Sequence, residues 1–368
     1  MKNIYRVLDL FSGAGGLSYG LEKTGYFKSL IALDFNEAAI ETFKKNHEDT
    51  KCIVGDITDK KVKDKIIKLS KKDKINMIVG GPPCQGFSNK GKNLGLKDER
   101  NFLFLEYVDL VKEIEPEIFI IENVKNMVSS ANGYFINEIV KLFTEMGYLV
   151  NYKIINSYEF GVPQTRERTI VIGSRNFKYD FKNLYKYTVK EEKRPKVHDA
   201  ISDLNYLNSG EGSDVSEYLI KSSSNYQKEM RKNSKKLYNH IATNHSEIAI
   251  NKLKMIPAEK GKEFLPIELR GKQKFKTTWS RLEWNKPSPT IDTRFDTPSN
   301  GKNSHPVLNR AITPREAARL QSFPDKYRFY GKKTEICKQI GNAVPPLLAE
   351  KIGLSLIEQI SRYKTGHK

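Results

Sequence analysis

Short β-forming runs alternate with segments of helical periodicity through the first half of the chain. The run at 118–121 is apolar throughout, which is typical of a strand buried on both faces of a sheet. Repeated βα units predict a mostly parallel sheet that is covered by helices on both faces. The expected strands are 6–9, 30–34, 52–54, 77–79, 118–121, 150–155 and 169–173, and the expected helices are 17–24, 37–46, 102–114 and 135–146.

The composition and the periodicity of the sequence change after residue 175. Residues 176–278 are polar, rich in lysine and serine and weakly periodic, so they predict a second, more irregular domain. Regularity returns where Thr313 can cap a helix that has Pro314 at its first position and Glu316 at its third. A final helix is expected from about 346 to 361, where apolar residues recur on one face.

The chain carries a formal net charge of +19, which favours polyanionic partners because neutralising phosphates releases condensed counterions. The lysine-rich stretch at 61–74 is equally typical of a solvated helix and turn, so charge alone does not decide for nucleic acid. No window approaches 18 uncharged apolar residues, and the first residues lack a signal-peptide core. We therefore expect a cytoplasmic protein with no membrane span.

A glycine-rich loop at 9–16 follows the first expected strand and opens the first helix. Glycines there let the backbone turn tightly and approach a ligand closely. Asp34 ends the second strand, where an acid can hold ribose hydroxyls, and Asp56 follows the third strand, where it can accept from an adenine amino group. Together these residues predict a nucleoside cofactor; a plain tight turn and an NAD enzyme are the alternatives.

Of the three cysteines, only Cys84 stands where a nucleophile is expected. Two prolines precede it in a loop after the fourth strand, and such a loop fixes where the thiol points. Glu122 ends the next strand, so it should lie along the same sheet edge and can share a proton with a ring nitrogen. Cys52 and Cys337 read as small buried residues, and the cysteine and histidine spacing predicts neither a disulfide framework nor a zinc site.

Six motifs taken together resemble the DNA (cytosine-5)-methyltransferase family. They are DLFSGAGG at 9–16, GGPPCQGFS at 80–88, ENV at 122–124, QTRER at 164–168, PREAARLQSFPD at 314–325 and KQIGNAVPP at 338–346, in the family's usual order. The resemblance implies an α/β fold with a Rossmann-like, mixed but mostly parallel sheet that binds S-adenosyl-L-methionine. Because the family's last helix folds back beside the first strand, it also implies a large domain of 1–175 plus 336–368. Residues 176–335 would form a smaller domain, with target recognition at about 176–278.

The resemblance also implies a role for individual residues. Cys84 would attack carbon 6 of cytosine, and Glu122 would bond to ring N3 and the exocyclic amine. Arg166 and Arg168 would brace Glu122 and the cytosine carbonyl, while Asn123 would support the loop. The cofactor would contact Phe11, Gly13, Gly15, Asp34, Phe35, Asp56, Ile57, Pro83, Leu103, Asn342 and Val344. No metal is expected, because adding a thiolate to carbon 6 is itself enough to make carbon 5 nucleophilic.

The target carbon is inaccessible inside a base stack, so the cytosine must be flipped out of double-stranded DNA. The segment 85–100 is predicted to close over the site, with Gln85 and Ser88 contacting DNA. Arg281 and Arg294 are further candidate DNA contacts, although packing of the smaller domain is at least as good a reading for nearby Trp279 and Trp284. We expect a monomer that acts beside a cognate restriction endonuclease in a bacterial or phage-infected cell.

Three other functions account for parts of the sequence less fully. A methyltransferase of the same fold that acts on tRNA cytosine carries a Cys-Phe-Thr element, which this sequence lacks. A non-catalytic DNA-binding module has no need of Cys84, Glu122 and Arg168 together. An NAD oxidoreductase would bind a nicotinamide and would give Cys84 no role.

Overall fold

A computed structural model describes residues 4–83, 102–129, 133–271 and 277–366. Its contacts divide the chain into two compact units. Unit 1 comprises Met1–Asn156, Glu167–Thr188 and Pro346–Lys368, and unit 2 comprises Ser157–Arg166 and Val189–Pro345. Residues 336–345 belong to unit 2 in this division. The large domain of 1–175 plus 336–368 that the sequence led us to expect stays a prediction.

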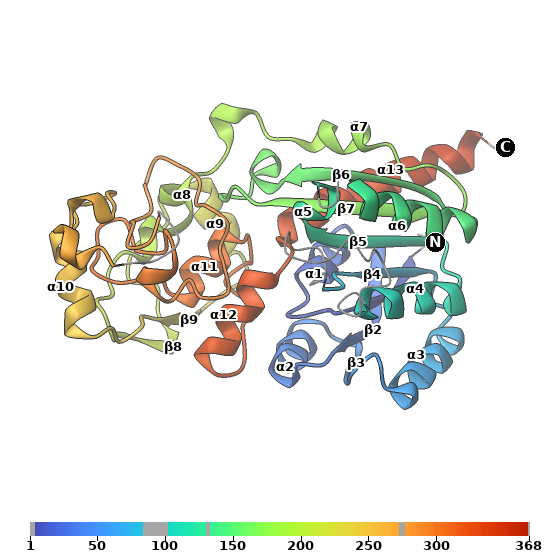
Figure 1. Cartoon of the computed structure of the whole chain (residues 1–368), viewed down its shortest axis with the longest axis horizontal. Helices are drawn as coiled ribbons and strands as arrows, with labels where there is room; N and C mark the ends of the chain where they lie inside the picture. The colour runs from blue at the N-terminus through green and yellow to red at the C-terminus, as the bar shows by residue number, and fades with distance from the viewer. Residues whose placement is uncertain (1–3, 84–101, 130–132, 272–276, 367–368) are drawn as a thin grey trace. The chain divides into compact units, whose positions relative to one another are not determined.

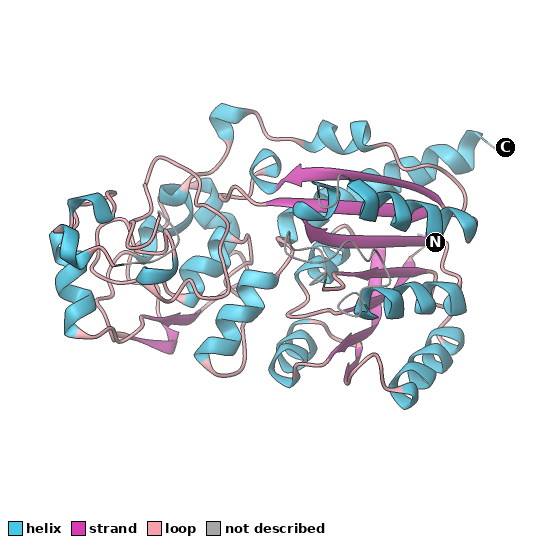
Figure 2. Ribbon diagram, viewed as in Figure 1, coloured by secondary structure: helices cyan, strands magenta, loops and turns pink. Residues whose placement is uncertain are grey.

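Unit 1 is built on a seven-stranded sheet of order β3-β2-β1-β4-β5-β7-β6 (Figures 1 and 2). Neighbouring strands from β3 to β5 are parallel, while β7 runs antiparallel to both β5 and β6. This confirms the predicted mixed, mostly parallel sheet. The strands are β1 Tyr5–Leu10, β2 Phe27–Asp34, β3 Lys51–Val54, β4 Met77–Gly80, β5 Ile118–Val124, β6 Leu149–Asn156 and β7 Glu167–Ser174.

Helices cover the two faces of this sheet. Figure 1 shows α6 on the near face and α13 on the far face, and α13 packs against α1. The helices of unit 1 are α1 Gly16–Lys23, α2 Glu37–Asn46, α3 Lys60–Lys72, α4 Phe102–Ile114, α5 Asn126–Ser129, α6 Tyr134–Glu145, α7 Phe181–Leu184 and α13 Pro346–Gly366. None of the helices in the described ranges is long and apolar enough to cross a bilayer.

The core of unit 1 explains why the central strands read as continuous apolar runs. All four residues of β4 are buried, and the side chains of Ile118–Ile121 in β5 are covered from both sides. Phe104, Tyr107 and Val111 of α4 belong to the same buried cluster. Tyr107 donates its hydroxyl to the carbonyl oxygens of Ile78 and Ile120, so its only polar atom is satisfied inside the core.

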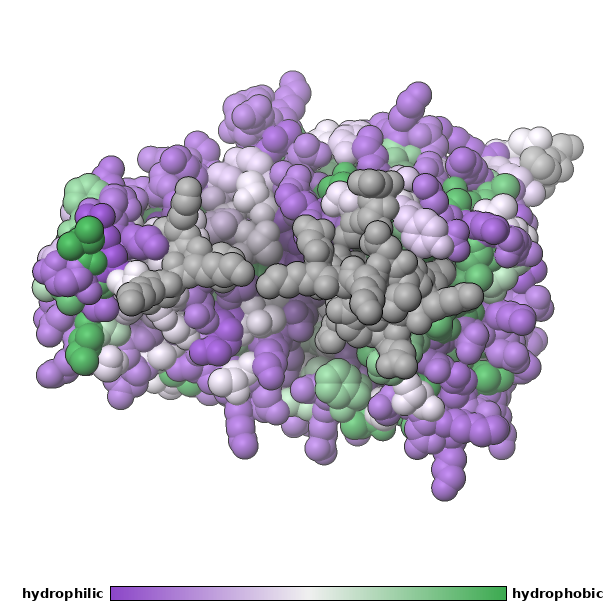
Figure 3. Space-filling view, in the orientation of Figure 1, coloured by the Kyte–Doolittle hydropathy of each residue, from purple (hydrophilic) through white to green (hydrophobic). Residues whose placement is uncertain are grey.

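Unit 2 has little regular structure, as the weak periodicity predicted. Its elements include the antiparallel pair β8 Gly212–Ser216 and β9 Leu237–Ile241, and the helices α8 Val197–Ile201, α9 Asn225–Arg231, α10 Glu247–Met255, α11 Pro314–Leu320 and α12 Lys333–Asn342. The start of α11 confirms the predicted cap: Thr313 Oγ1 accepts from the backbone of Glu316, whose carboxylate accepts from the backbone of Thr313. Figure 3 shows hydrophilic residues over most of the visible surface of this unit, with hydrophobic residues near α10.

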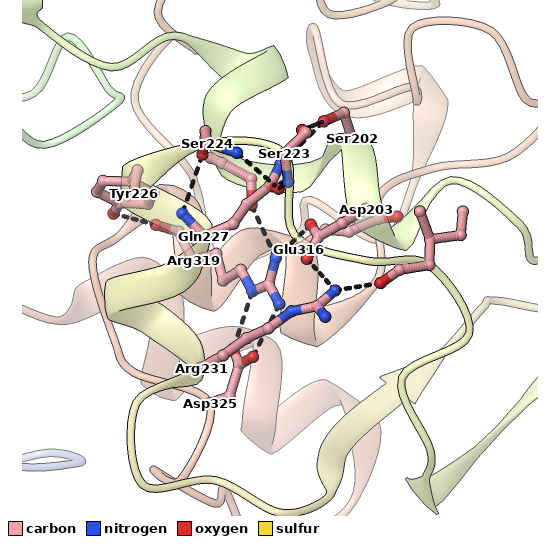
Figure 4. Close-up of polar contacts among 12 residues, drawn as sticks. Ser202, Asp203, Ser223, Ser224, Tyr226, Gln227, Arg231, Glu316, Arg319 and Asp325 are labelled. Carbon is pink, nitrogen blue, oxygen red and sulfur yellow. Dashed lines mark hydrogen bonds and ion pairs between the residues drawn. The ribbon is translucent and has the colours of Figure 1, made fainter.

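Buried ion pairs hold unit 2 together (Figure 4). The fully buried Arg319 guanidinium lies 2.5 Å from Asp203 Oδ1 and donates to both oxygens of Asp325 over 2.8 Å. Arg310 makes a similar bidentate pair with Glu316 at 2.7 and 2.8 Å. Each charge is matched by an opposite one, which is the condition under which buried charges are tolerated. Arg319 therefore joins segments of unit 2 that lie far apart in the sequence.

Candidate active site

A pocket of about 230 Å³ opens beyond the ends of β1, β2 and β3 in unit 1. This is the edge at which parallel α/β sheets bind ligands. It gathers predicted cofactor residues from separate parts of the sequence: Phe11, Asp34, Phe35, Asp56, Ile57, Pro83 and Leu103. Leu33, Gly55 and Phe102 also line it, and sequence reasoning had missed them although each adjoins a predicted residue.

The glycine-rich loop is tied to the acid at the end of β2. Gly13 N donates to Asp34 Oδ2 over 2.8 Å, and Asn36 N donates to Asp34 Oδ1 over 2.9 Å. Burial raises the pKa of the Asp34 carboxyl, while these backbone hydrogen bonds act in the opposite direction. Gly15 has φ +86°, a left-handed conformation that favours glycine. The loop conformation thus places Asp34 at the pocket with its carboxylate oriented by the backbone.

The pocket combines apolar walls with acidic groups at its edge. Phe35 is 78% exposed, so its ring offers a flat apolar surface to a bound partner. Asp56 is exposed, and its Oδ1 accepts from both the backbone and the hydroxyl of Thr58. Flat apolar surfaces between hydrogen-bond acceptors suit a base and a ribose. The residues present therefore fit a nucleoside.

Glu122 lies in β5, four strands along the sheet from β3, and is 8% exposed. Arg168 of the neighbouring β7 places its Nε 3.0 Å from Glu122 Oε1. The other carboxylate oxygen faces the segment after β4, because a Cβ built on Gly81 would lie 3.3 Å from Glu122 Oε2. The expected pairing of Arg168 with Glu122 is therefore present in the geometry.

Asn123 connects the same strand to the segment that leads toward Cys84. Its side-chain amide donates to the carbonyl oxygen of Pro82 over 2.8 Å, and the bond is buried. This bond fixes the backbone at Pro82, two residues before Cys84 in the sequence. Cys84, Gln85 and Ser88 themselves lie outside the described residues.

Comparison with known proteins identifies this arrangement. The family model of the C-5 cytosine-specific DNA methylases matches residues 5–358. The chain belongs to this family. Its curated relatives include the type II methyltransferase M.DdeI of Desulfomicrobium norvegicum, which is 35% identical over 97% of this chain and 88% of the relative. The type II methyltransferase M1.HphI of Haemophilus parahaemolyticus is 34% identical over 95% of this chain and 86% of its own.

Solved structures of other methyltransferases share the fold. A protein described as a DNA modification methyltransferase encoded within an Escherichia coli prophage superposes with a TM-score of 0.75 at 27% identity, over 97% of this chain and 99% of the other. The Dnmt2 methyltransferase of S. pombe gives a TM-score of 0.62 at 19% identity, over 96% of this chain and 99% of the other, a likeness in fold alone.

Three further predicted site residues of this C-5 cytosine-specific methylase lie in unit 2. Asn342 ends α12 and is exposed, and Val344 is buried just beyond it. Arg166 is buried and donates from Nη1 to the carbonyl oxygen of Ile291 at 3.4 Å. The roles expected of these residues in cofactor binding and catalysis stay predictions.

The structure corrects the expectation for Arg281. This residue is 2% exposed, and all three guanidinium nitrogens donate to protein acceptors. The acceptors are the carbonyl oxygens of Leu253, Ile256, His305 and Leu308 and the side chain of Asn309. A guanidinium engaged in this way holds α10 and two loops together instead of meeting DNA. Arg294, by contrast, is exposed.

Proposed function

We propose that the pocket at the ends of β1, β2 and β3 binds S-adenosyl-L-methionine. Asp34 would hold the ribose hydroxyls, Asp56 would accept from the adenine amino group, and Phe35 and Ile57 would cover the base. The acids at the strand ends, the exposed Phe35 ring and membership of a methylase family support this assignment. Calorimetry with S-adenosyl-L-homocysteine and with NAD tests it: the homocysteine compound should bind and NAD should not.

The proposed reaction begins with the thiolate of Cys84, which adds to carbon 6 of cytosine and forms a carbon–sulfur bond. Glu122 shares a proton with ring N3, so the addition yields a neutral enamine that is nucleophilic at carbon 5. Bound S-adenosyl-L-methionine supplies the methyl group that carbon 5 accepts. The carbon-5 proton then leaves to a base, the carbon–sulfur bond breaks and the thiolate returns to Cys84. Ring N3 gives its proton back to Glu122, which restores neutral 5-methylcytosine and the starting enzyme.

The Arg168–Glu122 contact carries this proposal, because it orients one carboxylate oxygen and leaves the other facing the segment before Cys84. Asn123 would fix the backbone of that segment through its hydrogen bond to the carbonyl oxygen of Pro82.

We further propose that unit 2 reads the DNA sequence through the region 176–278, while 1–175 and 336–368 bind the cofactor and perform the chemistry. The net charge of +19 supports a duplex DNA substrate, since phosphates attract such a chain. The relatives named as type II methyltransferases support a cognate restriction endonuclease in the same cell. We expect a monomer, because one target base is handled at each site. We expect this monomer to act in the cytoplasm.

Covalent capture tests the chemistry directly. Duplex DNA that carries 5-fluorocytosine cannot release the carbon-5 substituent, so the enzyme should stay attached in the presence of cofactor. A denaturing gel should show the adduct with the natural protein and none with Cys84→Ala. Binding to DNA without any adduct would indicate a non-catalytic DNA-binding protein instead.

A further inference from the structure

Two aromatic rings lie directly against the backbone of the glycine-rich loop. Phe43 and His47, one helical turn apart at the end of α2, stack with their centroids 4.0 Å apart and their planes at 22°. A Cβ built on Gly15 would lie 2.6 Å from His47 Nε2 and 2.7 Å from Phe43 Cδ2. Carbon atoms do not approach that closely, so the rings and the loop backbone are already at contact distance. The loop cannot move toward α2.

His47 is itself fixed by α1. Its side chain is fully buried, and Nδ1 donates to Glu22 Oε2 over 2.8 Å, while Glu22 Oε1 accepts from Ser29 N over 2.9 Å. Burial acts to raise the pKa of Glu22, but the hydrogen bonds from His47 and Ser29 hold that pKa below its usual value. Glu22 is therefore a carboxylate near neutral pH, and it locks the orientation of the imidazole.

The same helix connects His47 to the pocket acid. Asn36 caps the start of α2 by accepting from Ala39 N, and its own backbone nitrogen donates to Asp34. Asp34 in turn receives the hydrogen bond from Gly13 N of the loop. The loop is thus held to one end of α2 through Asp34 and to the other end through His47. Displacing either contact changes how Asp34 and Phe11 face the pocket.

We propose that His47, held by Glu22, is a positioning residue for the cofactor pocket. It acts through Gly15 and touches no reacting atom. The inference rests on the proposed S-adenosyl-L-methionine site. Removing the imidazole frees the loop to relax toward α2, so binding of the cofactor must then also order the loop, and affinity falls while the chemistry of bound cofactor is unchanged.

The test compares three variants of the full chain with S-adenosyl-L-homocysteine as the calorimetric probe. His47→Ala should raise the Kd by about tenfold, with kcat at saturating cofactor within about twofold of the natural enzyme. His47→Phe keeps a ring against Gly15 but loses the hydrogen bond to Glu22. Its Kd should therefore lie between those of the natural protein and His47→Ala. Tyr148→Phe is the matched control: it removes a buried hydrogen bond to the carbonyl oxygen of Pro116 at the opposite edge of the sheet, and should leave the Kd unchanged.

Each outcome bears on the inference. If His47→Ala and Tyr148→Phe both lose stability and both bind with the natural Kd, His47 is merely part of the core and the inference fails. If His47→Ala does not fold, the Kd values of His47→Phe and Tyr148→Phe are compared instead. A natural Kd in both variants would again overturn the inference. If the natural protein does not bind S-adenosyl-L-homocysteine at all, the proposed cofactor site fails first, and the inference fails with it.

Discussion

Arg168 Nε lies 3.0 Å from Glu122 Oε1, and the two side chains come from the adjacent antiparallel strands β5 and β7. Both are largely buried, with side-chain exposures of 16% and 10%. The antiparallel strand β7 is what makes this pair possible, because it returns along β5 and places Arg168 opposite Val124, two residues from Glu122. The guanidinium then orients the carboxylate whose other oxygen faces the segment before Cys84.

Glu122→Gln should lower kcat by about 100-fold or more, because the amide cannot share a proton with ring N3. Single-turnover methylation of a short duplex measures this rate. The Kd for S-adenosyl-L-homocysteine should stay within about twofold, since the pocket residues are untouched. An unchanged rate for Glu122→Gln would remove Glu122 from the mechanism.

Asn123→Ala tests whether the hydrogen bond from Asn123 to Pro82 helps to position Cys84 for its proposed attack. The variant leaves a buried carbonyl oxygen without this donor, so it should cost about 1–3 kcal/mol of stability. It should also slow adduct formation with 5-fluorocytosine DNA. A variant destabilised to the same extent elsewhere, such as Tyr148→Phe, provides the control. Equal adduct rates in the two variants would mean that Asn123 contributes to folding alone.

Asp9 predicts a specific dependence of stability on pH. Burial raises the pKa of this carboxyl to about 7, although the hydroxyl of Ser18 donates to it over 2.6 Å. The native state therefore keeps a proton on Asp9 that the unfolded chain releases near pH 4. The proton's contribution to the free energy of unfolding is fully present below pH 4 and is lost as pH rises to about 7. Asp9→Asn removes the titration. Denaturant unfolding at pH 5 and pH 8 should show a smaller fall in stability for Asp9→Asn than for the natural protein, and an identical fall would contradict the assignment.

Arg319→Gln should destabilise unit 2 by about 3–5 kcal/mol, because Asp203 and Asp325 are then left buried without their shared partner. Thermal unfolding measures the effect. Arg362→Ala is the matched control, since it breaks an exposed pair with Glu358 on α13 and should leave the unfolding temperature nearly unchanged. Comparable losses in the two variants would show that the buried network does not stabilise the unit.

Arg294→Ala should weaken DNA binding and leave the melting temperature unchanged. If the exposed Arg294 guanidinium neutralises one phosphate, the slope of log affinity against log salt should fall by about one. Arg281→Ala should behave in the opposite way and lose stability through its broken hydrogen bonds. An unaltered salt slope for Arg294→Ala would exclude Arg294 as a phosphate contact.

The central sheet could be predicted because each strand carries its own evidence. Strands buried on both faces must be apolar throughout, and each polar group at a strand end stands out against such a run. The pocket followed from the same reasoning, since Asp34 ends β2 and Asp56 follows the adjacent strand β3. The direction of β7 is not visible in its own residues. It follows from the short connection 157–166, which has no room for a crossover helix.

Unit 2 was less accessible to sequence reasoning because its stability depends on distant polar partners. Arg319 is paired with Asp203, more than a hundred residues away, and nothing in either local segment indicates the other. Arg281 was misplaced for the same reason: its own segment does not show that its partners lie in segments before and after it in the sequence. Its acceptors are backbone carbonyls at the end of α10 and in the loop 305–309, and the side chain of Asn309, and none of these has a sequence signature.

The most direct test is base-resolution methylation sequencing of plasmid DNA from cells that express this protein, beside cells that express Cys84→Ala. The account predicts 5-methylcytosine at one short sequence with the natural protein and none with the variant. Plasmid DNA without 5-methylcytosine, from cells in which the protein is folded and binds S-adenosyl-L-homocysteine, would contradict a DNA substrate and point to RNA or to a silent binding protein.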